Sequence, residues 1–134
     1  LSSRSQWCDK DHVMLCACFQ LLVDFIEKEK PQKIVDYDHD PEHRRIWKEL
    51  KALYRYWKVE RPRAERAKER ALRIWSAGYK CRRVPDPDGR GVRLEVLKEN
   101  KSAGRVLKRL ETAFDRREDE MLGRLIAIRR HLWC

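Results

Sequence analysis

Apolar residues recur along this chain with the spacing of amphipathic helices. The clearest pattern begins at Asp40 and Pro41, where an aspartate N-cap is followed by a proline at the first helical position. From Ile46 to Trp57, apolar residues stand at positions i, i+1, i+4, i+7, i+8 and i+11. Because proline lacks a backbone N–H, Pro62 is expected to break or kink this helix. We therefore predict one helix from 41 to 61 and another from 63 to 77.

The N-terminal part of the chain is more uniformly apolar. A helix is expected from Asp11 to about Glu29, with Asp9 or Asp11 as its N-cap and Pro31 beyond its end. Most residues between 13 and 26 are apolar. A helix of this composition is expected either to lie at the centre of the core or to bury a second face in a partner.

The C-terminal half is predicted to contain a loop and a long helix. Two prolines and an Asp-Gly pair mark consecutive turns, so a Pro/Gly-rich loop is expected at about 78–91. Residues 92–97 fit a short strand and the start of a helix equally well. The apolar spacing then predicts a last helix from Ser102, its candidate N-cap, to about residue 133.

These elements predict an all-α fold, a bundle of about four helices with one Pro/Gly-rich loop, in a single helical domain over residues 1–134. A chain of 134 residues is long enough to bury a core without a metal or a disulfide. Its five cysteines form no C-x-x-C pair, which indicates reduced thiols in a cytosol. No apolar run reaches the roughly 18 residues of a membrane span, so we expect no membrane partner.

Charge adds the most functional information. The chain has a net charge of +10 and a pI near 9.6. Between Arg61 and Arg83, nine Lys and Arg residues stand against two Glu residues, a local charge of +7. At 100° per residue, four arginines of the predicted helix fall within about 80° of one another. We call these residues the arginine stripe: Arg63, Arg66, Arg70 and Arg73.

The arginine stripe is a candidate binding surface for nucleic acid or another anion. Arginine binds phosphate through two parallel hydrogen bonds, and Lys80, Arg82 and Arg83 are expected to extend the patch. The alternative is a solvated helix face on which Glu65 and Glu69 supply i, i+4 partners. One-sided local charge favours the first interpretation.

Two clusters contain residue types that bind metals or take part in catalysis. Cys8, His12 and Cys16 are spaced i, i+4 and i+8, but over about 12 Å of helix at most two of them reach one ion. The acidic segment from Asp36 to His43 lacks the spacing and the glycine of an EF-hand. We therefore expect no metal, no cofactor and no enzymatic activity. A narrow polar strip also follows the first helix: His12, Cys16, Gln20, Asp24 and Glu27. An enzyme that uses this strip or the acidic segment is a third hypothesis.

Three segments resemble a known family. HVMLCACFQLLVDFIEKE at 12–29, WKELKALYRYWKVERP at 47–62 and EDEMLGRLIAIRRHLWC at 118–134 are similar, in this order, to small uncharacterised proteins of tailed bacteriophages. The resemblance covers about 40% of the chain. It implies a viral protein in the host cytoplasm or in the virion, and it carries no functional residues. Those proteins are usually more acidic, so the arginine stripe is expected to be particular to this chain.

The leading hypothesis is a non-enzymatic basic helical phage protein that binds an anionic partner, with nucleic acid or a nucleoprotein as first choice. Its mechanism is phosphate contact with little readout of bases. The alternative is a virion structural component, or an inhibitor of a host protein, that acts through helix-mediated protein–protein contacts. The apolar first helix motivates this alternative, and a homo-oligomer formed through such contacts belongs to it.

Overall fold

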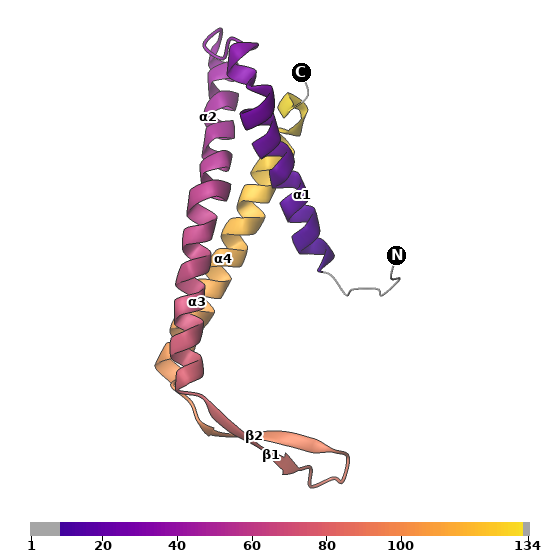
Figure 1. Ribbon diagram of the computed structural model, residues 1–134, viewed down its shortest axis with the longest axis vertical. Coiled ribbons are helices and arrows are strands. Elements are labelled where there is room, and N and C mark those ends of the chain that lie inside the picture. The colour runs from indigo at the N-terminus through magenta and orange to yellow at the C-terminus, as the bar shows by residue number, and fades with distance from the viewer. Residues whose placement is uncertain (1–8, 133–134) are drawn as a thin grey trace. The chain divides into compact units, whose positions relative to one another are not determined.

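The computed structural model describes residues 9–132 of this chain, and most of them are helical (Figure 1). The α-helices are α1 (Lys10–Asp24), α2 (Pro41–Arg55), α3 (Arg61–Ala77) and α4 (Lys101–Ala127). The strands are β1 (Lys80–Pro85) and β2 (Val92–Lys98), which pair in antiparallel orientation. Short π-helical turns occupy Phe25–Glu29 and Tyr56–Glu60, and 3-10 turns occupy Pro31–Lys33 and Arg129–Leu132.

The predicted helices agree with the structure to within a few residues, once the π-helical and 3-10 turns are counted. A break at Pro62 does not occur, because the π-helical turn Tyr56–Glu60 precedes it and helical residues run without a gap from Pro41 to Ala77.

Of the two N-caps expected for α1 the structure selects Asp9, and Asp40 caps α2 as predicted. The Asp9 carboxylate accepts the backbone N–H groups of Asp11 at 3.1 Å and His12 at 3.3 Å. Asp40 accepts the N–H of His43 at 2.8 Å. These bonds satisfy donors that a helix start leaves without an intrahelical partner.

The start of α4 differs from the prediction. Its first turn is capped by Asn100, whose Oδ1 accepts the N–H of Ala103 at 3.0 Å. Ser102 already lies inside the first helical turn, and its hydroxyl donates to the same oxygen at 2.9 Å. The prediction that Ser102 is the N-cap is therefore wrong, because a residue with its backbone inside the helix cannot serve as the flanking cap.

The hairpin of β1 and β2 makes the expected all-α bundle of about four helices wrong. β1 lies within the segment 78–91 that is expected to be a loop, and β2 decides residues 92–97 in favour of a strand. The turn signals belong to the connection between these strands. There the N–H of Asp86 donates to the carbonyl of Gly91 at 2.9 Å, and Gly89 and Gly91 adopt φ angles of 67° and 118° that favour glycine. Turn residues here mark the tip of a hairpin.

Contacts divide the chain into two compact units. The terminal unit comprises residues 1–60 and 118–134, and the central unit comprises residues 61–117. α1, α2 and the C-terminal part of α4 belong to the terminal unit. α3, both strands and the N-terminal part of α4 belong to the central unit.

The core of the terminal unit is built from the apolar faces of its helices. Phe19 and Leu22 of α1 are fully buried, as are Leu50 and Leu53 of α2. Phe19 stacks on Trp57, with ring centroids 4.6 Å apart and an interplanar angle of 5°. These buried side chains recur every three or four residues, so burial in this unit follows the periodicity of the sequence.

One ion pair joins α2 to α4 within the terminal unit. The Arg124 guanidinium donates from Nε and Nη2 to the two carboxylate oxygens of Glu49, at 2.6 and 2.8 Å. Bidentate pairs of this kind are stronger than single hydrogen bonds. The hydrogen bonds from Arg124 hold the pKa of the Glu49 carboxyl below its usual value. The pair therefore couples the stability of this unit to pH.

Glu49→Gln is expected to lower the free energy of unfolding at pH 7 by about 1 kcal/mol, because it removes a partly buried charged pair. Since folding lowers the pKa of Glu49, this contribution is complete above the unfolded pKa and is lost as the pH falls through the folded pKa. Urea unfolding followed by circular dichroism, at pH 7 and in steps below pH 4.5, measures both effects. Glu29→Gln, at an exposed position, is the control. A difference from wild type that persists at low pH would contradict this account.

Candidate functional site

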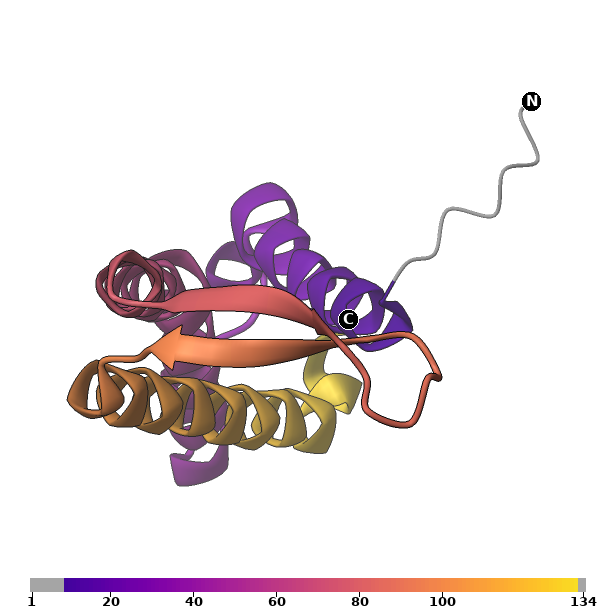
Figure 2. The same cartoon turned by 90° about the horizontal axis from the view of Figure 1, so that it is seen from below.

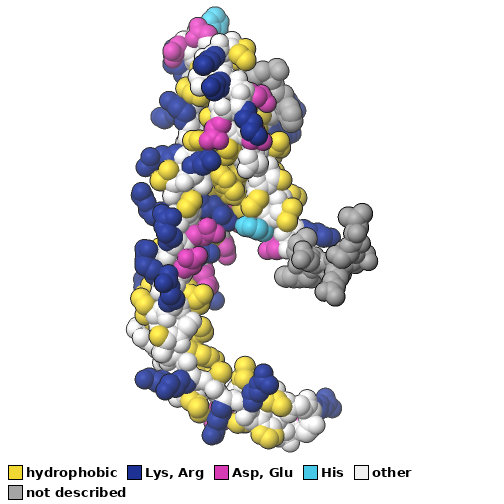
Figure 3. Space-filling view, in the orientation of Figure 1, with side chains coloured by type: hydrophobic (Ala, Val, Ile, Leu, Met, Phe, Trp, Pro, Cys, Tyr) yellow, Lys and Arg dark blue, Asp and Glu magenta, His cyan; other side chains and the backbone are white. Residues whose placement is uncertain are grey.

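The net charge of the chain belongs entirely to the central unit. Residues 61–117 contain 18 Lys and Arg and 8 Asp and Glu, which gives +10, whereas the terminal unit contains 14 of each sign. Dark-blue side chains of Lys and Arg follow the outer edge of α3 and recur on the hairpin (Figure 3). Charge gathered in one compact unit is a feature that proteins with anionic partners commonly share.

The arginine stripe lies exposed along α3. All four of its side chains reach solvent, whereas Ala71 on the adjacent side of the helix is buried. Among the residues that the structure describes, none of the four takes part in an ion pair. Glu65 contacts Arg61 instead, with 3.5 Å between Oε1 and Nη1. Glu69, which lies four residues before Arg73 and is the one i, i+4 carboxylate available to the arginine stripe, is exposed and forms no ion pair with it among the described residues.

The other three predicted residues, Lys80, Arg82 and Arg83, lie on β1 and not on the helix. Arg82 forms an ion pair with Glu95 of β2, with its Nε 2.8 Å from Oε2. Because side chains alternate along a strand, Arg82 and Arg83 project from opposite faces of the hairpin. The hairpin extends away from the ends of α3 and α4 (Figures 1 and 2). The seven predicted residues thus occupy two elements of the same unit.

Nine further cations of the central unit lie beyond Arg83, where the predicted patch stops, and seven of them lie on the hairpin and in the first turns of α4. All seven are exposed, three on the hairpin and four in the first turns of α4: Arg90, Arg93, Lys98, Lys101, Arg105, Lys108 and Arg109. The charge count over 61–117 is the signal that would have found them. The limits of that window, however, come from the contacts of the folded chain.

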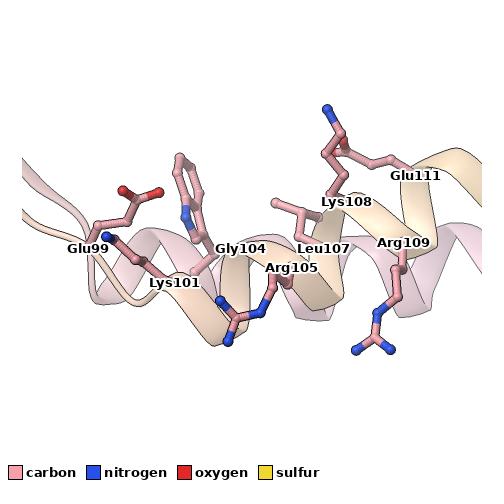
Figure 4. Close-up of a pocket in the computed structure, with 9 residues that line it drawn as sticks. Glu99, Lys101, Gly104, Arg105, Leu107, Lys108, Arg109 and Glu111 are labelled. Atoms are coloured by element: carbon pink, nitrogen blue, oxygen red, sulfur yellow. The ribbon is translucent and has the colours of Figure 1, made fainter.

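A surface hollow of about 870 Å³ adjoins this part of α4 (Figure 4). Trp75 of α3 lines it, together with the cations of α4 and with Glu99 and Glu111. The indole packs on Tyr79 with ring centroids 4.8 Å apart. Gly104 lets α4 approach the indole, since a Cβ there would lie 3.2 Å from its Nε1. An aromatic ring beside several cations suits a base for stacking and a phosphate for ion pairing.

Two cations of α3 serve packing inside the central unit. The ammonium of Lys68 lies 3.6 Å from the ring centroid of Phe114, and the guanidinium of Arg61 lies 5.2 Å from it. Phe114 and its neighbour along the helix, Leu107, are buried. This contact joins α3 to α4, and it directs these two cations away from the arginine stripe.

Phe114→Ala is expected to lower the free energy of unfolding of the central unit by about 3 kcal/mol, because it leaves a cavity under Lys68 and Arg61. Phe114→Leu keeps most of the buried volume and loses only the cation–π contacts, so its cost should be about 1 kcal/mol. Amide hydrogen exchange over residues 61–117 reports the stability of this unit separately. A Phe114→Leu variant as stable as the wild type would contradict a contribution from the cations, and equal losses in the two variants would contradict one from the buried volume.

The remaining candidate clusters have local roles or fall outside the described residues. Cys8 lies outside them, and the Nε2 of His12 is 3.5 Å from the Sγ of Cys16 on α1. Asp40 caps α2, and its second oxygen lies 2.8 Å from Nδ1 of His43. Within residues 9–132, no three His, Cys, Asp or Glu side chains are grouped to hold a metal ion. In the same part of the chain, every helix is too short or too polar to cross a membrane.

Comparisons with protein-family models, with curated proteins and with solved structures find no match for this chain. The resemblance to proteins of tailed bacteriophages therefore stays a prediction from three helical segments.

Proposed function

We propose that the central unit binds nucleic acid through its phosphate backbone, without catalysing a reaction. The observation that carries this proposal is the segregation of charge. The net charge of +10 lies in residues 61–117, while the terminal unit is neutral overall. Neutralisation of phosphates supplies most of the affinity of sequence-independent binding. Such binding needs many cations close together, and the central unit supplies them.

The arginine stripe has dimensions that suit a run of phosphates. Arg63 and Arg73 are ten residues apart, which corresponds to about 15 Å along a helix. Duplex nucleic acid carries one negative charge per about 1.7 Å of its axis, so several phosphates lie within that length. The four guanidinium groups are exposed and are in no ion pair among the described residues. Contacts of this kind position a protein on the backbone and leave the base sequence unread.

The hairpin and the hollow beside Trp75 extend the proposed surface. Lys80 and Arg83 add charge on β1, and the first turns of α4 add four more cations. A base that stacks on the indole would do so whatever its identity, because every base has an aromatic face. The proposed surface therefore favours affinity without sequence preference.

The resemblance to phage proteins leads us to propose the setting as well. The ligand would be nucleic acid or a nucleoprotein of a tailed phage, in the host cytoplasm or in the virion. A second candidate function is a virion component, or an inhibitor of a host protein, that acts through helix contacts. It is favoured by one observation, the exposed apolar side of α1.

Arg66→Glu combined with Arg70→Glu is expected to weaken binding at least tenfold, because it reverses two charges in the middle of the arginine stripe. The measurement is fluorescence anisotropy of labelled single-stranded and duplex oligonucleotides at low salt. Lys48→Glu with Arg55→Glu is the matched control, since it makes the same change of charge on exposed positions of α2. Unchanged affinity in the stripe variant, or equal loss in the control, would overturn the proposal.

The salt dependence of binding tests phosphate contact itself. For duplex DNA the logarithm of the association constant falls with the logarithm of salt concentration, with a slope of about −0.9 per phosphate neutralised. Arg66→Gln with Arg70→Gln removes two such contacts, so the slope should become shallower by about 2. Titrations between about 50 and 200 mM salt measure it. An unaltered slope would mean that these arginines do not touch phosphate.

A further inference from the structure

α1 is apolar on two opposite sides, and the terminal unit buries only one of them. Four core residues form the buried side: Leu15, Phe19, Leu22 and Val23. On the other side, Val13 is 54% exposed, Met14 60% and Leu21 54%, and Ala17 between them is exposed as well. Exposed apolar side chains that adjoin one another mark a contact surface more often than isolated ones do.

The exposed side has a defined width and sequence. At 100° per residue, a sector of about 100° contains six residues of α1, which we call the outer face: Lys10, Val13, Met14, Ala17, Leu21 and Asp24. The four buried residues fall in a sector centred about 180° away. No rotation of α1 about its axis buries both sectors in the same core. The outer face is apolar in the middle, with a cation at one end and an anion at the other.

We infer that the outer face of α1 pairs with the outer face of a second copy of this chain, antiparallel about a two-fold axis through Ala17. Lys10 of one copy then meets Asp24 of the other, because both lie seven residues from Ala17. Val13 and Leu21, each four residues from it, meet in the same way. The small side chain at the axis allows the two helices to approach closely.

Charge favours a second copy over other occupants of this surface. A face that runs from cation through apolar residues to anion is its own complement when reversed, as a two-fold contact requires. The terminal unit has no net charge, so two copies do not repel each other there. The exposed apolar side chains of the hairpin, Leu94 and Val96, instead lie among cations that disfavour a second copy.

The Asp24 carboxylate uses one oxygen for contacts within its own helix and has the other for such a partner. Its Oδ1 accepts a hydrogen bond from Gln20 at 2.9 Å and lies 3.1 Å from the ammonium of Lys28. Both contacts hold the pKa of the Asp24 carboxyl below its usual value. Its other oxygen faces an opposing Lys10 in the proposed pair. Neither side chain has to be desolvated deeply, since both remain at the edge of the contact.

The proposed contact is a single helix pair, so the dimer is expected to be weak. A standard stable interface buries about 1,600 Å² in total, and two helices of about four turns bury less. We expect a dissociation constant of about 10 to 100 μM. The dimer therefore forms at high protein concentration, or where a shared ligand concentrates two copies.

Sedimentation equilibrium of the full chain tests the inference, after nuclease treatment and in about 0.5 M salt, where phosphate binding is screened. The wild-type mass should rise from 16.2 kDa toward twice that value across the micromolar range. Ala17→Glu sets two carboxylates against each other at the axis and should keep the chain at 16.2 kDa. Ile34→Glu is the control, because Ile34 is 75% exposed in the same unit and lies outside the outer face.

A charge exchange tests the antiparallel register. Lys10→Glu alone should weaken the dimer, and adding Asp24→Lys should restore it, since the pair then forms with reversed signs. Both substitutions also suit the helix dipole, so the double variant is expected to fold. A wild-type chain that stays at 16.2 kDa throughout, a dimer indifferent to Ala17→Glu, or equal loss in Ile34→Glu would overturn the inference. Because nucleic acid is absent, the result is independent of the proposed function.

Discussion

The packing around Phe19 is the interaction on which the rest of the structure depends. Its ring is fully buried and stacks on Trp57, with Leu22, Leu50 and Leu53 equally buried in the same core. Apolar burial is the main stabilising term in a folded chain, at about 25 cal/mol per Å². Among the described residues, the large side chains that are completely buried all belong to the terminal unit. The central unit has fewer buried apolar side chains, and its surface carries the net positive charge.

That charge has a cost as well as a use. Cations gathered in one compact unit repel one another and destabilise it, and an anionic ligand relieves the repulsion. Some of them are compensated within the unit, as in the Arg82–Glu95 pair and the stacking of Lys68 on Phe114. The arginine stripe has no such ion-pair compensation among the described residues. The arginine stripe lacks ion pairs while nearby cations have partners, and binding of an anion explains this difference better than a need for solubility does.

The two proposals use different units and support each other. The central unit would meet phosphate, and the outer face of α1 would join two copies through the neutral unit. Two basic units in one dimer bind a long polyanion with an effective concentration that a single unit lacks, even when the dimer contact is weak. The sequence predicts that the apolar first helix lies either in the core or against a partner. In the proposed dimer it does both, because one side packs in the core and the other meets the second copy.

Sequence by itself determined what depends on near neighbours along the chain. The positions of the helices to within a few residues, the cap at Asp40 and the angular width of the arginine stripe follow from local spacing, because a helix is defined by contacts three or four residues apart. Only the tertiary structure decided that β1 pairs with β2, which side of α1 is buried, and where the basic unit ends at residue 117. Strand pairing, and the choice between two apolar sides of one helix, depend on contacts between distant segments, which local spacing does not specify.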